Sequence, residues 1–265
     1  NVDYKARTVE IDGIVLKEGD FISINGTTGE VYNGKVETKA AEVSGDFADL
    51  MALCEKYTKL VVRTNADTPH DAQVARNFGA VGIGLCRTEH MFFEAEKIVA
   101  MREMILSPDA EGRKKALAKL LPYQKADFYG IFKAMDGCPV NVRLLDPPLH
   151  EFVPHDAKGQ EEMAAAMGVS VQTIKQRVES LCEANPMLGH RGCRLGNTYP
   201  EITEMQTRAI LGAAIQLKKE GGDPHPEIMV PLTGILYEFE AQEKVIRGTA
   251  AELFAEEGIE IPFKV

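Results

Sequence analysis

The sequence predicts an α/β fold, a (β/α)8 barrel of the TIM type that is incomplete at its C-terminal side. From about residue 45 onward, short apolar runs alternate with amphipathic stretches of helical period. Continuous apolar strands of this kind are typical of a parallel sheet covered by helices. The chain lacks the glycine fingerprint of dinucleotide-binding sheets, which favours a barrel over an open, doubly wound sheet. About six of the eight strands that a closed barrel needs can be counted.

The first part of the chain has a different pattern. Residues 8–32 alternate apolar and polar side chains, with turn signals such as Asn25-Gly26 between the alternating runs. This pattern predicts short antiparallel strands and a hairpin. Because the segment is too small to stand alone, we expect it to be the end of a preceding β-containing domain. The expected division is therefore 1–40 for that domain end and its linker, and 41–265 for the barrel.

The barrel elements follow from the apolar runs and the helical periods between them. Thr68 is expected to cap a helix that has Pro69 at its first position. The short segment 189–195 is expected to be either a strand or a loop at the rim of the sheet. The expected strands are 60–64, 81–86, 140–145, 227–232 and 261–265. The expected helices are 46–56, 68–77, 92–135 with breaks near Pro108 and Pro122, 158–167, 171–184, 201–219 and 236–257.

Composition limits the classes of partner. The 265 residues are 45% hydrophobic, enough for a full core, and their formal net charge is -10. Such an acidic chain is not expected to bind nucleic acid or anionic membranes in general, so any anion site must be a local arrangement of bases. No run approaches the roughly 20 apolar residues of a membrane span. We expect a soluble protein.

Cysteine usage and the chain ends add two expectations. The five cysteines are scattered without a Cys-x-x-Cys pair, which argues against a disulfide framework and a zinc site and favours a reducing cytoplasm. The chain starts without methionine and ends on the apolar run 262–265, without a turn or cap after it. We therefore expect a fragment of a longer protein.

Two arginines are the first candidates for a binding site. Arg87 and Arg143 each stand where an apolar run meets a polar turn. If these runs are neighbouring parallel strands, both guanidinium groups project from one rim and can clamp a doubly charged anion. A phosphate ester that also carries a carboxylate fits such a clamp. Arg63 and Arg191 also lie at or near expected strand ends.

A structural role for these arginines stays open. Each guanidinium group can instead pair with a nearby acid, for example Asp67, Glu89 or Asp146, and merely stabilise the rim. No role is assigned to the histidines near the rim, because none has metal-ligand spacing, and the cysteines in apolar runs are expected to be inert core thiols. These residues are His90, His150, His155, His190, Cys86 and Cys193.

Four segments of the chain closely resemble a known family. They are 63–67 (RTNAD), 82–93 (GIGLCRTEHMFF), 143–154 (RLLDPPLHEFVP) and 185–195 (NPMLGHRGCRL). They resemble the pyruvate, phosphate dikinases, a branch of the phosphoenolpyruvate-utilising enzymes that also include phosphoenolpyruvate synthase and enzyme I of the sugar phosphotransferase system. The resemblance extends over essentially the whole chain.

This resemblance implies a function for the barrel. The family interconverts pyruvate, ATP and phosphate with phosphoenolpyruvate, AMP and diphosphate, through a phosphohistidine carried on a swivelling domain. Residues 1–40 are similar to the end of that domain, and the barrel is similar to the part that binds phosphoenolpyruvate and pyruvate. Arg87 and Arg143 match the family's substrate-binding arginines, and Arg191 matches a further basic rim residue.

The resemblance also implies what lies outside this chain. The phosphohistidine, the proton-donor cysteine and the Mg2+ ligands match positions that are absent here, so we expect neither a catalytic nor a metal-binding residue among the 265. The expected partners are phosphoenolpyruvate or pyruvate, the phosphohistidine domain of the same parent, and a second copy in a homodimer. The expected location is the cytoplasm.

Three other functions remain open. The chain can be a catalytically inactive module that binds anions or forms dimers, or it can belong to the related synthase or enzyme I reactions. An unrelated barrel lyase acting on a phosphorylated keto acid is a further possibility. That lyase would need a catalytic lysine or other base at a strand end, and Lys264 fits such a position poorly.

Overall fold

The computed structural model describes residues 2–39 and 41–265. The described residues divide into two compact units, one that ends at Lys56 and one that spans Tyr57–Val265.

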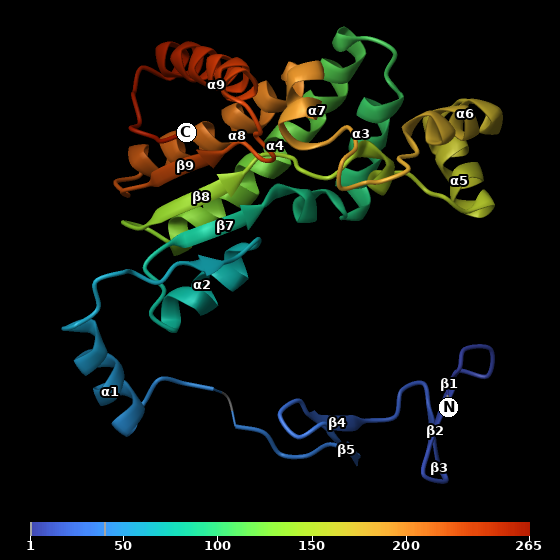
Figure 1. The fold of residues 1–265 in the computed structure, drawn as a ribbon, viewed down its shortest axis with the longest axis vertical. Coiled ribbons are helices and arrows are strands. Elements are labelled where there is room, and N and C mark those ends of the chain that lie inside the picture. Colours follow the sequence, from blue (N-terminus) through green and yellow to red (C-terminus); the bar gives the residue numbers. More distant parts are fainter. Residues whose placement is uncertain (1, 40) are drawn as a thin grey trace. The chain divides into compact units, whose positions relative to one another are not determined.

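The smaller unit consists of short antiparallel strands and one helix. Strands β1 (Val2–Asp3), β2 (Thr8–Ile11) and β3 (Ile14–Lys17) form one sheet, and β4 (Ile22–Asn25) pairs with β5 (Glu30–Asn33) in a hairpin (Figure 1). The turn of the hairpin is closed by the Gly29 N–H, which donates to the carbonyl oxygen of Asn25 (2.8 Å). These strands confirm the antiparallel pattern read from the sequence. Helix α1 (Gly45–Glu55) follows them.

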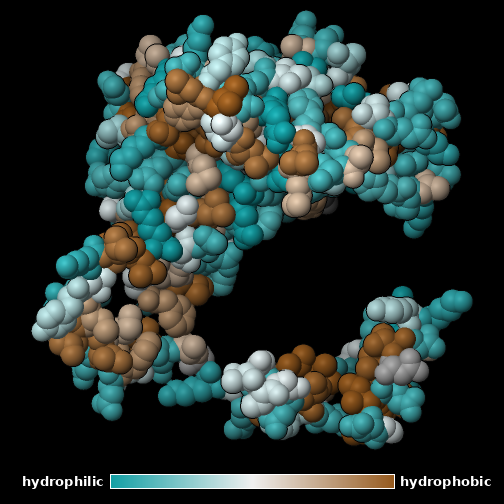
Figure 2. All heavy atoms as spheres, viewed as in Figure 1, coloured by the Kyte–Doolittle hydropathy of each residue, from teal (hydrophilic) through white to brown (hydrophobic). Residues whose placement is uncertain are grey.

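The smaller unit exposes much of its apolar surface. Phe21 is 69% exposed and Ile24 is 67% exposed, and the described residues of α1 include none that is buried. Figure 2 shows hydrophobic side chains gathered on the surface of these strands. A unit that buries so little apolar surface gains little hydrophobic stabilisation of its own. This agrees with the expectation that the segment is too small to stand alone.

The larger unit is built on a parallel sheet. Among the described residues the sheet has four strands in the order β6 (Thr64–Asn65), β7 (Ile83–Arg87), β8 (Pro139–Arg143) and β9 (His225–Met229). They lie side by side in chain order, as Figure 1 shows. The predicted parallel α/β architecture is confirmed, whereas closure into a barrel stays a prediction because the described sheet is open.

Helices pack on one face of this sheet. In β8, Val140 and Val142 are fully buried, whereas Pro139, Asn141 and Arg143 alternate with them on the opposite face. The buried face packs against side chains of three long helices. The helices of this unit are α2 (Pro69–Asn77), α3 (Ala95–Leu106), α4 (Ala110–Ala134), α5 (Ala157–Met167), α6 (Val171–Leu181), α7 (Gly192–Thr198), α8 (Pro200–Lys219) and α9 (Leu236–Glu257), with 3-10 turns η1 (Thr88–Phe92) and η2 (Leu149–Phe152).

Two predicted strand segments differ from the structure, and a third segment, expected to be either a strand or a rim loop, takes the second form at its start. Strand 60–64 is reduced to β6, because this edge of the described sheet leaves Leu60, for instance, 84% exposed, with no apolar cover. Segment 261–265 forms only one parallel bridge, Glu227 with Lys264, and Pro262 within it has no N–H to donate. Segment 189–195 is no strand: a loop leads to α7, which starts at Gly192 with φ of 58°.

Two predictions about helices also need correction. The expected break at Pro122 is wrong, because α4 runs through this proline. Leu120 and Gln124, on either side of it, are fully buried, and this packing outweighs the roughly 3 kcal/mol cost of proline inside a helix. The other break is confirmed near Pro108, between α3 and α4. Helix α6 ends at Leu181, three residues earlier than Ala184.

Candidate functional site

Arg87 and Arg143 lie next to each other at one edge of the sheet. They are the last residues of β7 and β8 and are direct partners in the register of these parallel strands. Both lie on the face opposite the helix-covered core, because the buried Cys86 and Val142 immediately precede them. The prediction that these two arginines share one rim is confirmed.

Asp67 fixes the orientation of Arg87. This aspartate follows β6 and is only 8% exposed. Its carboxylate accepts hydrogen bonds from the backbone N–H (2.7 Å), Nε (3.0 Å) and Nη2 (2.7 Å) of Arg87. These side-chain hydrogen bonds raise the pKa of Arg87 above its ordinary value. The Nδ1 atom of His90 lies 3.0 Å from the same carboxylate.

Arg143 and Arg191 are held in a similar way by two other acids. Arg143 donates through Nη2 to Oε1 of Glu89, and its Nη1 lies 3.1 Å from Oδ2 of Asp146. Arg191 comes from the loop before α7, and its Nη2 donates to the same Oδ2 of Asp146 (2.8 Å). Arg191 therefore joins the rim of Arg87 and Arg143, although it does not end a strand.

Charge at this rim is balanced within the site. Three guanidinium groups and three carboxylates sum to no net formal charge. We call this set of residues the arginine–carboxylate cluster; its members are Arg87, Arg143, Arg191, Asp67, Glu89 and Asp146.

The cluster supports both interpretations of the arginines. Each arginine pairs with an acid, as the structural interpretation predicted. The side chains of Arg87, Arg143 and Arg191 are nevertheless 38%, 20% and 19% exposed, so part of each guanidinium group remains open to solvent. A guanidinium group has five N–H donors, and one carboxylate does not use them all. The cluster can therefore present fixed, oriented donors to an anion.

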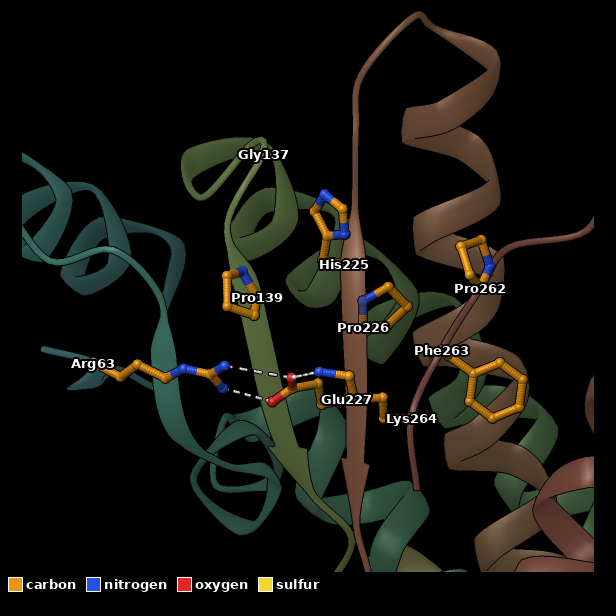
Figure 3. A pocket seen from close by; sticks show the side chains of 9 residues that line it. All are labelled: Arg63, Gly137, Pro139, His225, Pro226, Glu227, Pro262, Phe263 and Lys264. Carbon is orange, nitrogen blue, oxygen red and sulfur yellow. Dashed lines mark hydrogen bonds and ion pairs between the residues drawn. The ribbon is translucent and has the colours of Figure 1, made fainter. Parts of the chain in front are cut away.

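Arg63 does not join this cluster. It precedes β6 and reaches across the open face of the sheet to Glu227, with Nη1 2.6 Å from Oε2. Lys264 binds the other oxygen of the same carboxylate at 3.2 Å, so Glu227 lies between two cations (Figure 3). The expectation that Arg63 lies at the rim with the other arginines is therefore wrong.

The surroundings of Glu227 form an open pocket of about 380 Å³, drawn in Figure 3. Its walls include Pro139 and His225, which are the first residues of β8 and β9. The arginine–carboxylate cluster lies at the other end of these strands, because Arg143 is the last residue of β8. In parallel α/β sheets, ligands bind beyond the carboxyl ends of the strands. We therefore place the candidate site at the cluster and not in this pocket.

The cysteines show no sign of nucleophilic activity. Cys86 is completely buried, and this burial raises the pKa of its thiol. Cys193 is 1% exposed, and desolvation likewise raises the pKa of its thiol. Both cysteines are thus held in the protonated, unreactive form at neutral pH.

The histidines remain without an assigned role. His150 and His155 approach each other with ring centroids 6.0 Å apart, and Nε2 of His190 hydrogen-bonds to Thr198 (3.0 Å). In the part of the chain that the structure describes, no group of three or more histidine, cysteine, aspartate or glutamate residues is arranged to hold a metal ion.

Sequence reasoning missed the double role of Asp146. It named this aspartate as one possible partner for an arginine, but did not foresee that it binds two. The spacing of three residues between Arg143 and Asp146 is the only local signal, and nothing in the sequence places Arg191 beside them. The position of the loop that carries Arg191 is seen only in the structure.

The fold and the rim agree with a family comparison. Residues 41–265 match the model of the PEP-utilising enzymes, described as their PEP-binding domain, where PEP is phosphoenolpyruvate. The chain therefore belongs to the family of PEP-utilising enzymes.

Individual relatives point to one branch of this family. The chain is 55% identical over 264 residues to a pyruvate, phosphate dikinase of Giardia intestinalis and 49% identical over 265 residues to that of Clostridium symbiosum. Both alignments cover 100% of this chain and 30% of the relative. A chloroplastic pyruvate, phosphate dikinase of Flaveria trinervia is 54% identical over 254 residues, which are 95% of this chain and 27% of the relative. The chain thus spans about 30% of the length of such relatives.

None of the helices in the described segments 2–39 and 41–265 is long and apolar enough to cross a bilayer.

Proposed function

We propose that this chain is the phosphoenolpyruvate- and pyruvate-binding portion of a pyruvate, phosphate dikinase. The parent enzyme would interconvert pyruvate, ATP and phosphate with phosphoenolpyruvate, AMP and diphosphate through a phosphohistidine. The observation that carries this proposal is the side-by-side placement of Arg87 and Arg143 at the carboxyl ends of β7 and β8. Membership of the family and identities of about half to relatives with this name support it.

In this proposal the arginines bind the anionic groups of the substrate. Arg87 and Arg143 bind its phosphoryl and carboxylate oxygens, and Arg191 contributes further donors from the loop before α7. Fixed guanidinium groups of this kind stabilise charge on a phosphoryl group in transfer and keep it in line with the attacking atom. The carboxylates of the cluster hold the donors in place before the substrate binds, so little reorganisation is needed.

The proposal extends to the architecture of the parent. Residues 41–265 would form about six of the eight strand–helix units of a barrel, with the open sheet as its incomplete wall. Residues 1–40 would be the end of the swivelling phosphohistidine domain and the linker that follows it. The antiparallel strands β1 to β5, which leave apolar side chains exposed, support the view that this segment is part of a larger β-containing domain.

Mg2+ is unfavourable at the carboxylates of the cluster. Asp67, Glu89 and Asp146 are each bound to guanidinium groups. The positive charge of these arginines opposes a further cation at the same carboxylates. We therefore propose that the metal ligands come from a part of the parent outside these 265 residues, and we assign no metal role to the cluster.

The remaining features of the proposal concern the assembly and its location. The parent would form a homodimer through the barrel and would work in the cytoplasm. Relatives named chloroplastic make a plastid the alternative location. The alternatives for its chemistry are the related reactions of phosphoenolpyruvate synthase and enzyme I. The 265-residue chain by itself would be inactive.

An unrelated lyase is not supported. That hypothesis requires a catalytic lysine or other base at a strand end, and Lys264 fits this position poorly. Its ammonium group is paired with Glu227 on the open face of the sheet. This pair lies away from the strand ends that carry the cluster. Membership of the PEP-utilising enzymes further argues against an unrelated barrel.

The proposed function is tested by removing the two strand-end arginines from the full-length parent. We expect Arg87→Ala and Arg143→Ala each to lower kcat/KM for phosphoenolpyruvate by about 10²- to 10³-fold, since one oriented charge contact contributes about 3–4 kcal/mol. The measurement is pyruvate formation from phosphoenolpyruvate, AMP and diphosphate. The control is Arg247→Ala, which removes a surface arginine of α9 paired with Glu243. Near wild-type rates in both rim variants would refute the assignment.

A further inference from the structure

Asp146 connects two arginines that reach the rim from different elements. Its Oδ2 atom lies 3.1 Å from Nη1 of Arg143 and 2.8 Å from Nη2 of Arg191. Arg143 belongs to β8, whereas Arg191 precedes α7. The two guanidinium groups thus share one carboxylate oxygen.

The backbone of Asp146 strengthens this connection. Its carbonyl oxygen accepts a hydrogen bond from the Gly192 N–H (3.0 Å) and another from Nε of Arg191 (3.3 Å). The residue is only 5% exposed, and its Oδ1 atom has no hydrogen-bond partner within the described residues. The side chain is therefore held through Oδ2, and the placement of Arg191 relative to Arg143 depends on this residue.

Electrostatics explains why such a bridge is needed. Two guanidinium groups that approach the same point repel each other, and this repulsion is strong in a partly buried site. The carboxylate between them offsets the repulsion, and it accepts from only some of the guanidinium N–H groups, so others remain for a ligand. If the bridge were lost, the two cations would move apart and would no longer present their donors to one anion together.

We propose that Asp146 is a positioning residue that sets Arg143 and Arg191 in one arrangement for the anionic substrate. It acts through the two arginines and does not touch the substrate. This inference rests on the proposed function, because it concerns how the same rim binds phosphoenolpyruvate.

The first test replaces the carboxylate by the amide of similar shape in the full-length parent. The Asp146→Asn amide can place its oxygen at the position of Oδ2, but it carries no negative charge to offset the repulsion between Arg143 and Arg191. We expect kcat/KM for phosphoenolpyruvate to fall by between about 10- and 100-fold, as for a misplacement of about 1 Å at an active site. Glu252→Gln is the matched control, because Glu252 pairs with Arg208 on the exposed side of α8 and α9.

A second test measures the coupling between the two arginines, first with Asp146 in place and then in the Asp146→Asn background. Arg143→Lys and Arg191→Lys are made singly and together in the parent, and kcat/KM is measured for each. A shared bridge predicts that the double variant loses at least about 5-fold less than the product of the single losses, because either substitution already disturbs the other arginine. In the Asp146→Asn background the two losses should multiply. A purely structural role for Asp146 would change stability without changing this coupling.

The outcomes distinguish this inference from the proposed function on which it rests. An active parent in which Asp146→Asn stays within about twofold of wild type, or in which the lysine substitutions act independently, overturns the positioning role and leaves the proposed function standing. A parent that does not form pyruvate from phosphoenolpyruvate overturns the proposed function, and the inference with it. Loss of rate in Asp146→Asn together with coupled arginines supports both.

Discussion

Asp67 shows how a single carboxylate can hold an arginine side chain in one orientation. It accepts three hydrogen bonds from Arg87, one of them from the backbone, so the guanidinium group has little freedom to rotate. A flexible arginine would lose side-chain entropy on binding substrate, whereas this one has lost it already during folding. Under the proposed function, the acid contributes to binding although it carries the same sign of charge as the substrate.

This view leads to a prediction for Asp67→Asn in the full-length parent. An amide presents one acceptor oxygen and turns its N–H donors toward the N–H donors of Arg87, so the orientation of the arginine should be lost. We expect kcat/KM for phosphoenolpyruvate to fall by about 10-fold or more, measured by steady-state kinetics. Asp71→Asn, at an exposed aspartate four residues further on, serves as the control. Equal kinetics for both variants would show that Asp67 does not orient Arg87.

At this scale the sequence predicted the residues better than their arrangement. Arg87 and Arg143 follow apolar runs, and their shared rim follows from parallel pairing alone. Arg63 looked equivalent by the same criterion, yet it precedes β6 and points to Glu227 on the open face of the sheet. The error has a physical cause: the edge strand is only two residues long, so its end could not be located from hydrophobicity.

Helices were predicted well where local sequence signals determine their ends, and poorly where contacts with distant residues determine them. Helices α2 and α9 were predicted almost to the residue, because capping residues and helical period are local signals. The continuity of α4 through Pro122 could not be predicted, since it depends on packing against α8 and the sheet. Likewise, the start of α7 depends on hydrogen bonds from Gly192 and Cys193 to residues distant in sequence.

The N-cap of α2 gives a prediction for this scale. The Thr68 hydroxyl accepts a hydrogen bond from the Asp71 N–H (3.1 Å), one of the otherwise unpaired donors of the first turn. Thr68→Ala should lower the free energy of unfolding by about 1 kcal/mol, measured by urea denaturation. Thr68→Ser keeps the acceptor and should stay close to wild type. If the alanine variant is as stable as the serine variant, the cap makes no net contribution.

For the whole molecule, the sequence specified the class of architecture but not its closure. The parallel order of β6 to β9 and their helical cover follow from continuous apolar strands and intervening helices. A closed barrel is a global property of all eight strands, so no local pattern in about six units can establish it. The acidic composition predicted that any anion site would be a local arrangement of bases; the arginines at the rim form such an arrangement, and acids balance their charge.

The cysteines differ in burial, and their reactivity should report this difference along the whole chain. Cys54 and Cys182 are exposed, whereas Cys86, Cys138 and Cys193 are buried. We expect a small alkylating reagent at pH 8 to modify the two exposed thiols quickly in the native chain and all five after denaturation in urea. Burial also raises the pKa of Cys86, which keeps its thiol protonated. Mass spectrometry of the modified peptides gives the readout, and rapid native labelling of Cys86 would contradict the described core.

The balance of charge in the arginine–carboxylate cluster bears on selectivity. A site with a large positive excess attracts any anion over the distance of a Debye length. Here the rim has no formal excess charge, and the chain as a whole carries -10. An anion gains only when it comes close enough, in the right orientation, to accept the fixed N–H groups. If the cluster binds phosphoenolpyruvate as proposed, abundant inorganic ions would have little advantage from their charge, and shape would decide which molecule stays bound.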